Sequence, residues 1–200
     1  MPIDVVLNKK ATAEDVQNFG ANYVILATGA QMEKSPFDHG ASDRVLTVIQ
    51  VLNGVEPQGE KILVMGGGVI GCETALYLAR QGKQVTISTR RDANALAEDL
   101  YDHNNHDVLL MMIKAAEITV LSETIPVRVE NDGVVVEQSG AEKKIPVDSL
   151  VFAGRMIPEN DLSRSLEKMS TVFSVGDCVK PERIMESVWG GFKAVREIEE

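Results

Sequence analysis

The sequence predicts an α/β fold with a mostly parallel sheet and an antiparallel β insert. Segments with strand-like patterns alternate with helix-like segments along the 200 residues, which is typical of a parallel sheet covered by helices. Residues 61–65 form an apolar run that enters a glycine-rich loop, and a helical pattern leaves that loop. The turn sequence Asn131-Asp132-Gly133 joins two segments of alternating hydrophobicity, which indicates a β-hairpin.

Short elements are expected in the first third of the chain. The apolar run 23–27 predicts a strand that ends at Thr28 and Gly29. The other expectations for this part are a strand at 3–7, a helical turn from Thr12, a loop at 31–43, a short helix or strand at 44–52 and a linker at 54–59.

The rest of the chain predicts longer elements. Residues 61–65 read as a buried parallel strand, 69–81 as a helix ended by Gly82, and 84–88 as a second strand. Further on we expect a helix within 92–116, strands at 117–121, 125–130 and 134–138, a turn at 139–144, a strand at 149–153, a polar loop with a short helix at 156–170, a strand at 171–175 and an amphipathic helix at 184–199.

The loop Gly66-x-Gly68-x-x-Gly71 has the spacing of a dinucleotide-binding fingerprint. Gly66 permits a sharp turn, Gly68 lets a pyrophosphate approach the backbone, and Gly71 lets the helix pack closely on the sheet. The helix start at Val69 and Ile70 offers unpaired N–H groups to phosphates. A structural glycine turn is the alternative interpretation, but the flanking strand and helix favour a Rossmann-like nucleotide site.

The end of the second strand bears on which nucleotide binds. NAD-specific units usually carry an acidic residue there, whereas this chain has Thr89, Arg90 and Arg91 before the first carboxylate, Asp92. Two guanidinium groups suit a 2′-phosphate, which favours NADP over NAD. The alternative is that both arginines are solvated loop charges.

Composition excludes several classes of function. Hydrophobic residues make up 44% of the chain and the formal net charge is −10, so neither nucleic acid nor an acidic membrane is an expected partner. No apolar run approaches membrane-spanning length, and the first residues do not read as a signal peptide. Cys72 and Cys178 form no C-x-x-C pair, so we expect no redox-active disulfide and a cytoplasmic location.

Four motifs occur in an order that resembles a known superfamily. They are Ala27-Thr28-Gly29, the glycine loop continued to Glu73, Phe152-Ala153-Gly154-Arg155 with Pro158, and the segment from Thr171 to Gly176-Asp177. The chain thus resembles the FAD- and NAD(P)-dependent pyridine nucleotide oxidoreductases. The segment from Lys180 to Ile198 resembles the C-terminal region of the Old Yellow Enzyme-related group, which includes 2,4-dienoyl-CoA reductase and trimethylamine dehydrogenase.

The resemblance implies a domain organisation. Residues 57–148 would be an NAD(P)-binding domain nested in a partial FAD-binding domain, made of 1–56 and 149–200. The first glycine loop of that FAD domain has no room before Ala27, and neither an FMN-binding barrel nor a cysteine cluster for a 4Fe–4S centre is present. The chain would therefore be the C-terminal part of a larger flavoenzyme, and its missing N-terminal domains would be its partners.

The resemblance also implies roles for individual residues. Thr28 and Gly29 would lie at the edge of FAD, and Gly176-Asp177 would place a carboxylate on the flavin ribitol. Ala153 and Gly154 would lie near the nicotinamide. Glu73 matches a glutamate near nicotinamide and flavin, although an acid favoured by the helix dipole is the preferred interpretation. Asp177 has a turn aspartate as its alternative.

The function inferred from these motifs is NAD(P)H binding for hydride transfer to FAD in the full-length parent, with the fragment alone inactive. A non-catalytic ADP-binding module is the alternative. An exposed sheet edge where FAD-domain strands are missing also predicts self-association. His103 and His106 lie among Asp102 and Asp107, but we interpret this patch as a solvated face and expect no metal site.

Overall fold

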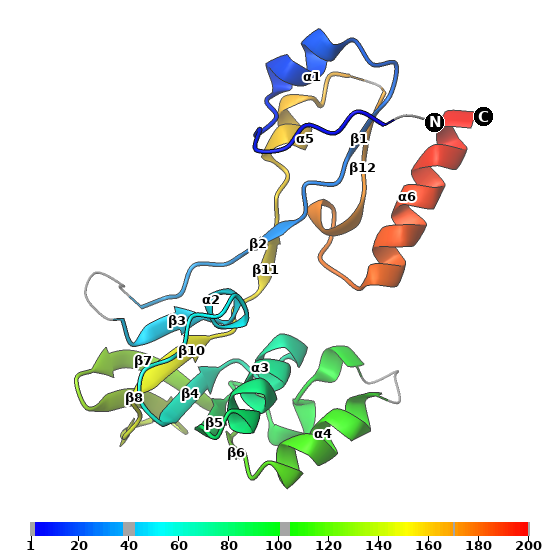
Figure 1. The fold of residues 1–200 in the computed structure, drawn as a ribbon. Coiled ribbons are helices and arrows are strands. Elements are labelled where there is room, and N and C mark those ends of the chain that lie inside the picture. Colours follow the sequence, from blue (N-terminus) through cyan, green and yellow to red (C-terminus); the bar gives the residue numbers. More distant parts are fainter. Residues whose placement is uncertain (1–2, 38–42, 101–104, 170, 200) are drawn as a thin grey trace. The chain divides into compact units, whose positions relative to one another are not determined.

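The computed structural model describes residues 3–37, 43–100, 105–169 and 171–199 (Figure 1). The chain divides into two compact units. The central unit is Lys34–Arg155, and the terminal unit combines Met1–Glu33 with Met156–Glu200. Each unit has its own sheets and helices and is described by itself.

A five-stranded parallel sheet forms the centre of the central unit. Its order is β3-β10-β4-β5-β6, and every neighbouring pair is parallel. The bounds are β3 Val45–Thr47, β4 Lys61–Met65, β5 Gln84–Ser88, β6 Thr119–Leu121 and β10 Ser149–Phe152. The middle residues of β4 are buried, as expected for a strand covered on both faces. The predicted α/β fold with a parallel, Rossmann-like sheet is confirmed.

Helices of the central unit connect these strands. They are α2 Val48–Leu52, α3 Val69–Arg80 and α4 Asn105–Ala115, with 3₁₀ turns η1 Ala93–Ala95 and η2 Glu98–Leu100. The buried side of α3 includes Ala75 and Leu78, and this helix contacts β4 and β5. The start of α3 therefore lies at the carboxyl end of β4, where parallel sheets of this type bind ligands.

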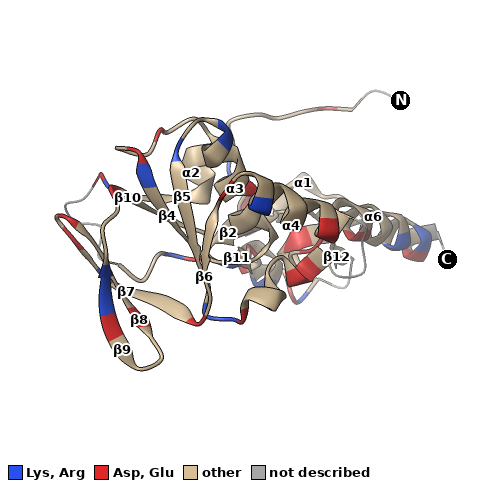
Figure 2. Cartoon of the chain, turned by 90° about the horizontal axis from the view of Figure 1, so that it is seen from below, with Lys and Arg blue, Asp and Glu red and all other residues tan. Residues whose placement is uncertain are grey.

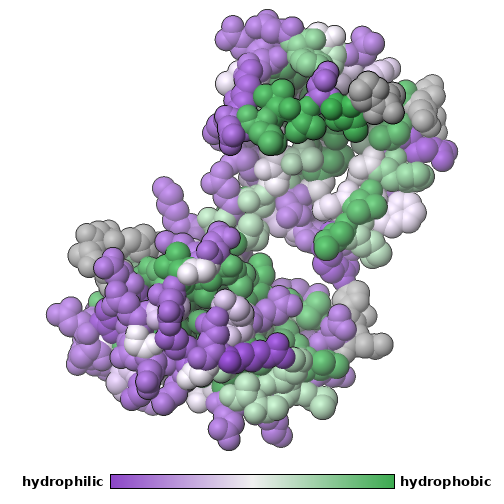
Figure 3. Space-filling view, viewed as in Figure 1, coloured by the Kyte–Doolittle hydropathy of each residue, from purple (hydrophilic) through white to green (hydrophobic). Residues whose placement is uncertain are grey.

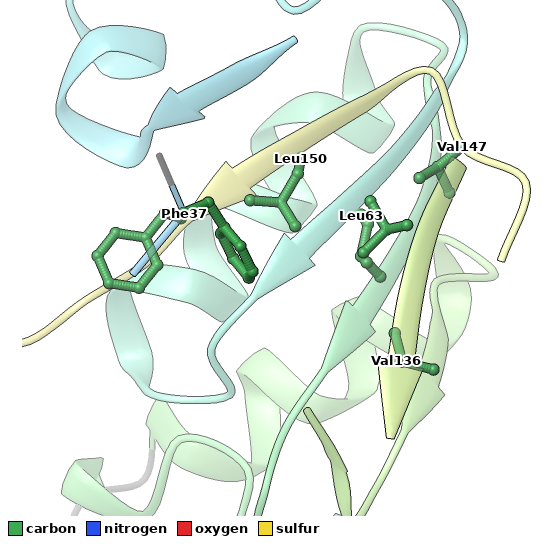
Figure 4. Close-up of a cluster of buried hydrophobic side chains, with 7 residues drawn as sticks. Phe37, Leu63, Val136, Val147 and Leu150 are labelled. Carbon is green, nitrogen blue, oxygen red and sulfur yellow. The ribbon is translucent and has the colours of Figure 1, made fainter. Parts of the chain in front are cut away.

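A three-stranded antiparallel sheet covers part of the parallel sheet. It consists of β7 Thr124–Glu130, β8 Gly133–Gln138 and β9 Ala141–Ile145 in the order β7-β8-β9. Figure 4 shows Leu63 and Leu150 of the parallel sheet beside Val136 of β8 and Val147. Phe37, Val134 and Phe152 complete this buried cluster. The antiparallel insert is thus joined to the parallel sheet by a shared hydrophobic core.

In its described residues, the terminal unit consists of two strand pairs and three helices. β1 Val24–Leu26 pairs in parallel with β12 Val172–Ser174, and β2 Ala30–Met32 pairs antiparallel with β11 Met156–Pro158. The helices are α1 Ala13–Phe19, α5 Asp161–Ser165 and α6 Ile184–Glu199, with a 3₁₀ turn η3 Gly176–Cys178 before α6. Segments from the two ends of the sequence therefore meet in this unit.

Five expectations about secondary structure are wrong or incomplete. The expected polar loop with a short helix at 156–170 begins with the strand β11. Residues 3–7 form no strand, and the expected turn at 139–144 is largely β9, which completes the antiparallel sheet. The expected loop at 31–43 begins with part of β2. The helix expected within 92–116 is confined to α4, because an Asp92-capped 3₁₀ turn interrupts the helical pattern. The pairing of β2 with β11 joins segments that lie far apart in the sequence, so local patterns do not reveal it.

The central unit, Lys34–Arg155, is longer than the segment 57–148 that is predicted to be the NAD(P)-binding domain. By their contacts, β3, α2 and β10 belong to the central unit, because β10 pairs with both β3 and β4. Arg44, before β3, reinforces this connection: its guanidinium donates to the carbonyl oxygens of Val147 at 2.6 Å and Glu130 at 2.8 Å. Which unit holds which cofactor remains a prediction.

Charges of both signs are interspersed on the antiparallel sheet (Figure 2). Arg128 pairs with Glu130 and Glu142, and Lys144 pairs with Glu130 and Asp132. These pairs are solvent-exposed and contribute little to stability individually. Among the described residues, no helix is both long and apolar enough to cross a membrane.

Candidate nucleotide-binding site

The glycine loop folds into a turn that only small residues tolerate. Gly66 has φ +128°, and its N–H donates to the Ser88 carbonyl oxygen at 2.9 Å. A β-carbon at Gly66 would lie 2.6 Å from the carbonyl oxygen of Ala153, and one at Gly71 would lie 2.1 Å from the carbonyl oxygen of Gly66. These short distances give Gly66 and Gly71 the turn and packing constraints that their spacing predicts.

Gly68 differs from its neighbours because the space that a β-carbon at this position would occupy is nearly empty. Among the residues that the structure describes, a β-carbon there would meet only the Asp99 Oδ2 atom, at 3.6 Å. Gly68 is also the N-cap of the 12-residue helix α3 and supplies no side-chain cap. The N–H groups of Val69 and Ile70 at this helix start lack intrahelical acceptors and carry the positive end of the dipole. This combination suits a phosphate group.

Gly67 was not singled out from the sequence, yet it is the most enclosed of the three consecutive glycines. A β-carbon there would lie 2.8 Å from both Leu96 and Thr89. The carbonyl oxygen of Gly67 accepts a hydrogen bond from the N–H of Ala97 at 2.8 Å. The segment after β5 is therefore packed onto the glycine loop, a contact between distant residues that local sequence does not reveal.

The residues expected to select the nucleotide lie at the end of β5. Thr89 is 5% exposed, and its hydroxyl accepts from the N–H of Arg91 at 3.2 Å. Arg90 and Arg91 are exposed. The Arg91 guanidinium forms an ion pair with Glu98 at 2.5 Å. Thr89 therefore packs against the glycine loop, whereas Arg91 is exposed and paired. Its partner, the Glu98 carboxylate, was not among the site residues predicted from the sequence.

Ala153 and Gly154 follow the carboxyl end of β10. The N–H of Ala153 donates to the Met65 carbonyl oxygen at 2.9 Å, so Ala153 lies against the glycine loop. Ala153 and Gly154 are partly exposed. Glu73 is exposed and lies in the second turn of α3. The preferred interpretation of Glu73 as a first-turn acid favoured by the helix dipole is therefore wrong, because the first turn of α3 holds no acidic residue. Of the residues expected near the nicotinamide, Ala153 is therefore the one that contacts the glycine loop directly.

Cys72 lies at the start of α3 without contributing a reactive thiol. Its side chain is fully buried, and burial raises the pKa of its thiol to about 11. Cys178 is also buried and free. His106 is hydrogen-bonded to the Leu96 carbonyl oxygen at 2.9 Å. His103 and Asp102 lie outside the described residues, and in the part of the chain that the structure describes no cluster could hold a metal ion.

The residues expected to contact FAD lie in the terminal unit. The Thr28 hydroxyl donates to the carbonyl oxygen of Glu159 at 2.5 Å, and the Gly29 carbonyl oxygen accepts from the N–H of Glu159 at 2.9 Å. Gly29 has φ +74°, in the region that favours glycine. The two residues thereby link β1 and β2 to the segment after β11.

Gly176 and Asp177 lie in η3, between β12 and α6. Gly176 has φ +70° and lines a pocket of about 170 Å³ with Ser174, Glu186 and Ser187. One Asp177 carboxylate oxygen accepts from the N–H of Glu182 at 3.3 Å. This pocket is smaller than the ~300–1,000 Å³ of ordinary small-molecule sites. This pocket by itself is therefore too small to hold a whole FAD.

The chain was compared with protein families and with known proteins. Residues 3–191 match the family model described as pyridine nucleotide-disulphide oxidoreductase. The chain belongs to the pyridine nucleotide-disulphide oxidoreductase family. It is 32% identical over 197 residues to the cinnamate reductase of Clostridium sporogenes. The aligned region covers 98% of this chain and 29% of the reductase.

Solved structures resemble this family member over nearly its whole length. The 6-hydroxypseudooxynicotine amine oxidase from Pseudomonas geniculata N1 has a TM-score of 0.79 and 24% identity, over 94% of this chain and 30% of the oxidase. The histamine dehydrogenase from Rhizobium sp. 4-9 has a TM-score of 0.80 and 18% identity, over 96% of this chain and 33% of the dehydrogenase. These two likenesses show the fold. The chain spans about three tenths of the cinnamate reductase it matches.

Proposed function

We propose that the central unit binds NAD(P)H on its glycine loop, with residues 57–148 as the NAD(P)-binding domain. The observation that carries this proposal is the open backbone at Gly68, directly at the N-terminus of α3 and at the carboxyl end of β4. Gly66 and Gly71 are enclosed by backbone atoms, whereas Gly68 leaves room where a pyrophosphate would approach. The residues present therefore fit a dinucleotide.

The remaining contacts of the nucleotide follow from this placement. The N–H groups of Val69 and Ile70 would bind the pyrophosphate, and Thr89, Arg90 and Arg91 would face the adenosine ribose or its 2′-phosphate. Ala153, Gly154 and Glu73 would lie toward the nicotinamide. Whether NADP or NAD binds depends on the charge that Arg91 offers.

We further propose that the parent protein is a flavin-dependent oxidoreductase of the Old Yellow Enzyme-related group. Residues 1–56 and 149–200 would form part of its FAD-binding domain, with Thr28, Gly29, Gly176 and Asp177 as flavin contacts. FAD and NAD(P)H supply the redox chemistry when bound, and the protein's part is to hold and orient them. FMN and a 4Fe–4S centre would belong to other domains of the parent.

The exposed side of α6 supports a need for partner domains. Hydrophobic side chains with at least two fifths of their surface exposed recur along this helix (Figure 3): Ile184, Met185, Val188, Trp189, Phe192 and Val195. Such a surface favours association with further domains or with a second copy. We therefore expect the chain by itself to self-associate and to bind nucleotide without turnover, and a non-catalytic ADP-binding module remains the alternative.

Calorimetric titration of the purified chain tests nucleotide binding. NADH, NADPH and ADP are each titrated into the chain and into a Gly68→Ala variant, whose β-carbon would project into the proposed pyrophosphate position. Binding that weakens at least about tenfold in the variant is expected, since 1.4 kcal/mol of lost contact corresponds to that factor. Equal affinities for both proteins would refute the proposed site.

A second experiment separates the enzyme from the ADP module. The full-length parent is supplied with FAD and NADPH or NADH, and loss of flavin absorbance is followed under anaerobic conditions. Flavin reduction is expected for the oxidoreductase. Retained ADP binding without flavin reduction by either nucleotide would favour the module instead.

A further inference from the structure

Two neighbouring carboxylates lie at the proposed phosphate positions of the glycine-loop site. Asp99 Oδ2 is 3.4 Å from the backbone nitrogen of Val69 and accepts its hydrogen bond. Glu98 Oε2 is 2.5 Å from Arg91 Nη1. The first contact occupies the N-terminus of α3, and the second occupies the guanidinium expected to face a 2′-phosphate. The protein therefore presents its own anions at both points.

Backbone packing holds the two carboxylates there. Both residues belong to the 3₁₀ turn η2, which follows directly after Ala97. Ala97 is fully buried, adopts the left-handed region with φ +50°, and donates its N–H to the Gly67 carbonyl oxygen. A non-glycine residue in that region is uncommon and is maintained by its surroundings. Leu96, 5% exposed, packs against Gly67 on the same side.

A carboxylate and a phosphate make similar demands on their partners. Both are acceptor-only anions that favour helix N-termini and guanidinium forks. A dinucleotide pyrophosphate on Val69 would meet Asp99, which among the described residues is also the only neighbour that a β-carbon at Gly68 would approach. A 2′-phosphate on Arg91 would have to replace Glu98.

We propose that Glu98 and Asp99 weaken nucleotide binding at this site by competing with the nucleotide's phosphates, and that Glu98 sets the preference between NADP(H) and NAD(H). Asp99 opposes the pyrophosphate of either dinucleotide, and Glu98 opposes the 2′-phosphate that distinguishes NADP(H) from NAD(H). The inference rests on the proposed nucleotide-binding function. Its consequence is that the paired Arg91 gives NADP(H) less advantage than the two arginines alone would suggest.

The test uses ADP-ribose and 2′-phospho-ADP-ribose as calorimetric probes, because they differ only in the 2′-phosphate and carry no redox-active ring. Glu98→Gln should tighten 2′-phospho-ADP-ribose about two- to fivefold and leave ADP-ribose unchanged, as expected from releasing an exposed ion pair. Asp99→Asn should tighten both probes by a similar factor. Glu60→Gln removes an exposed acid at the opposite end of β4 and serves as the matched control.

A double-mutant cycle with Arg91→Gln sharpens the result. In the wild-type background, this change should weaken 2′-phospho-ADP-ribose only slightly, because Glu98 already neutralises the guanidinium. In the Glu98→Gln background, Arg91→Gln should abolish the gain in affinity for 2′-phospho-ADP-ribose that Glu98→Gln alone produces. Additive effects of the two changes would overturn the proposed competition.

Other outcomes are equally decisive. If Glu98→Gln weakens 2′-phospho-ADP-ribose, Glu98 positions Arg91 for the phosphate and the proposal is wrong. If Asp99→Asn leaves both affinities unchanged or weakens them, its competition with pyrophosphate is refuted. Failure of the wild type and all variants to bind either probe would refute the proposed nucleotide site itself, a result distinct from binding that ignores these substitutions.

Discussion

Gly71→Ala is expected to destabilise the central unit more than any other single-methyl addition in the glycine loop. The new β-carbon would lie 2.1 Å from the Gly66 carbonyl oxygen and 3.2 Å from the Ala153 β-carbon, whereas ordinary contact begins at 3.4 Å. Backbone cannot yield as a flexible side chain does, so α3 must shift away from the turn after β4. Overpacking of this kind costs about 1–3 kcal/mol, and we expect the upper part of that range.

Urea unfolding followed by far-ultraviolet circular dichroism measures this cost. Gly191→Ala is the matched control, because it makes the same chemical change in α6 at a position where a β-carbon meets nothing within 4 Å. That control should stabilise the protein by about 0.5–1 kcal/mol through helix propensity. An unfolding midpoint for Gly71→Ala at or above that of the wild type would refute the packing argument.

Comparison with Gly68→Ala separates stability from binding. The open surroundings of Gly68 predict a loss of less than ~1 kcal/mol, mainly from replacing glycine at an N-cap. Nucleotide affinity should nevertheless fall in this variant, as described for the proposed site. Equal losses of stability in the Gly68 and Gly71 variants would show that the close packing around Gly71 does not determine how strongly a β-carbon there destabilises the protein.

Three further predictions concern positions outside the phosphate-binding contacts. Arg44→Ala should lower the free energy of unfolding by about 2–4 kcal/mol, measured with urea, because partly buried carbonyl oxygens of distant segments lose a charged donor. The Lys9 ammonium and the Thr12 capping groups lower the pKa of Asp15 to about 2. Its stabilising effect is therefore present above its unfolded pKa near ~4 and is lost as the pH falls through about 2. A nuclear magnetic resonance titration that places the Asp15 pKa near 4 would contradict this, and Lys9→Ala should raise it. Cys72, with its thiol pKa raised to about 11, should resist Ellman's reagent at pH 8 until urea unfolds the protein, and rapid native labelling at this position would contradict its burial.

Local signals in the sequence were sufficient for the elements that depend on neighbouring residues. The apolar run before Gly66 predicts β4, the spacing after it predicts α3, and Asn131-Asp132-Gly133 predicts the turn between β7 and β8. These elements depend on hydrophobic periodicity and turn chemistry, which act over a few residues. The α/β class and the family followed from the order of such elements.

Tertiary structure decided the features that join distant segments. β9 exists because its backbone completes the sheet beside β8, although its exposed, charged residues lack a strong strand pattern. The pairing of Arg91 with Glu98 and the capping of Val69 by Asp99 arise from the burial of Ala97 under Gly67. The sequence by itself therefore determined that a glycine loop precedes a helix, since this requires only local geometry. Only the fold decided which carboxylates face that loop, since a through-space contact depends on how the whole unit packs.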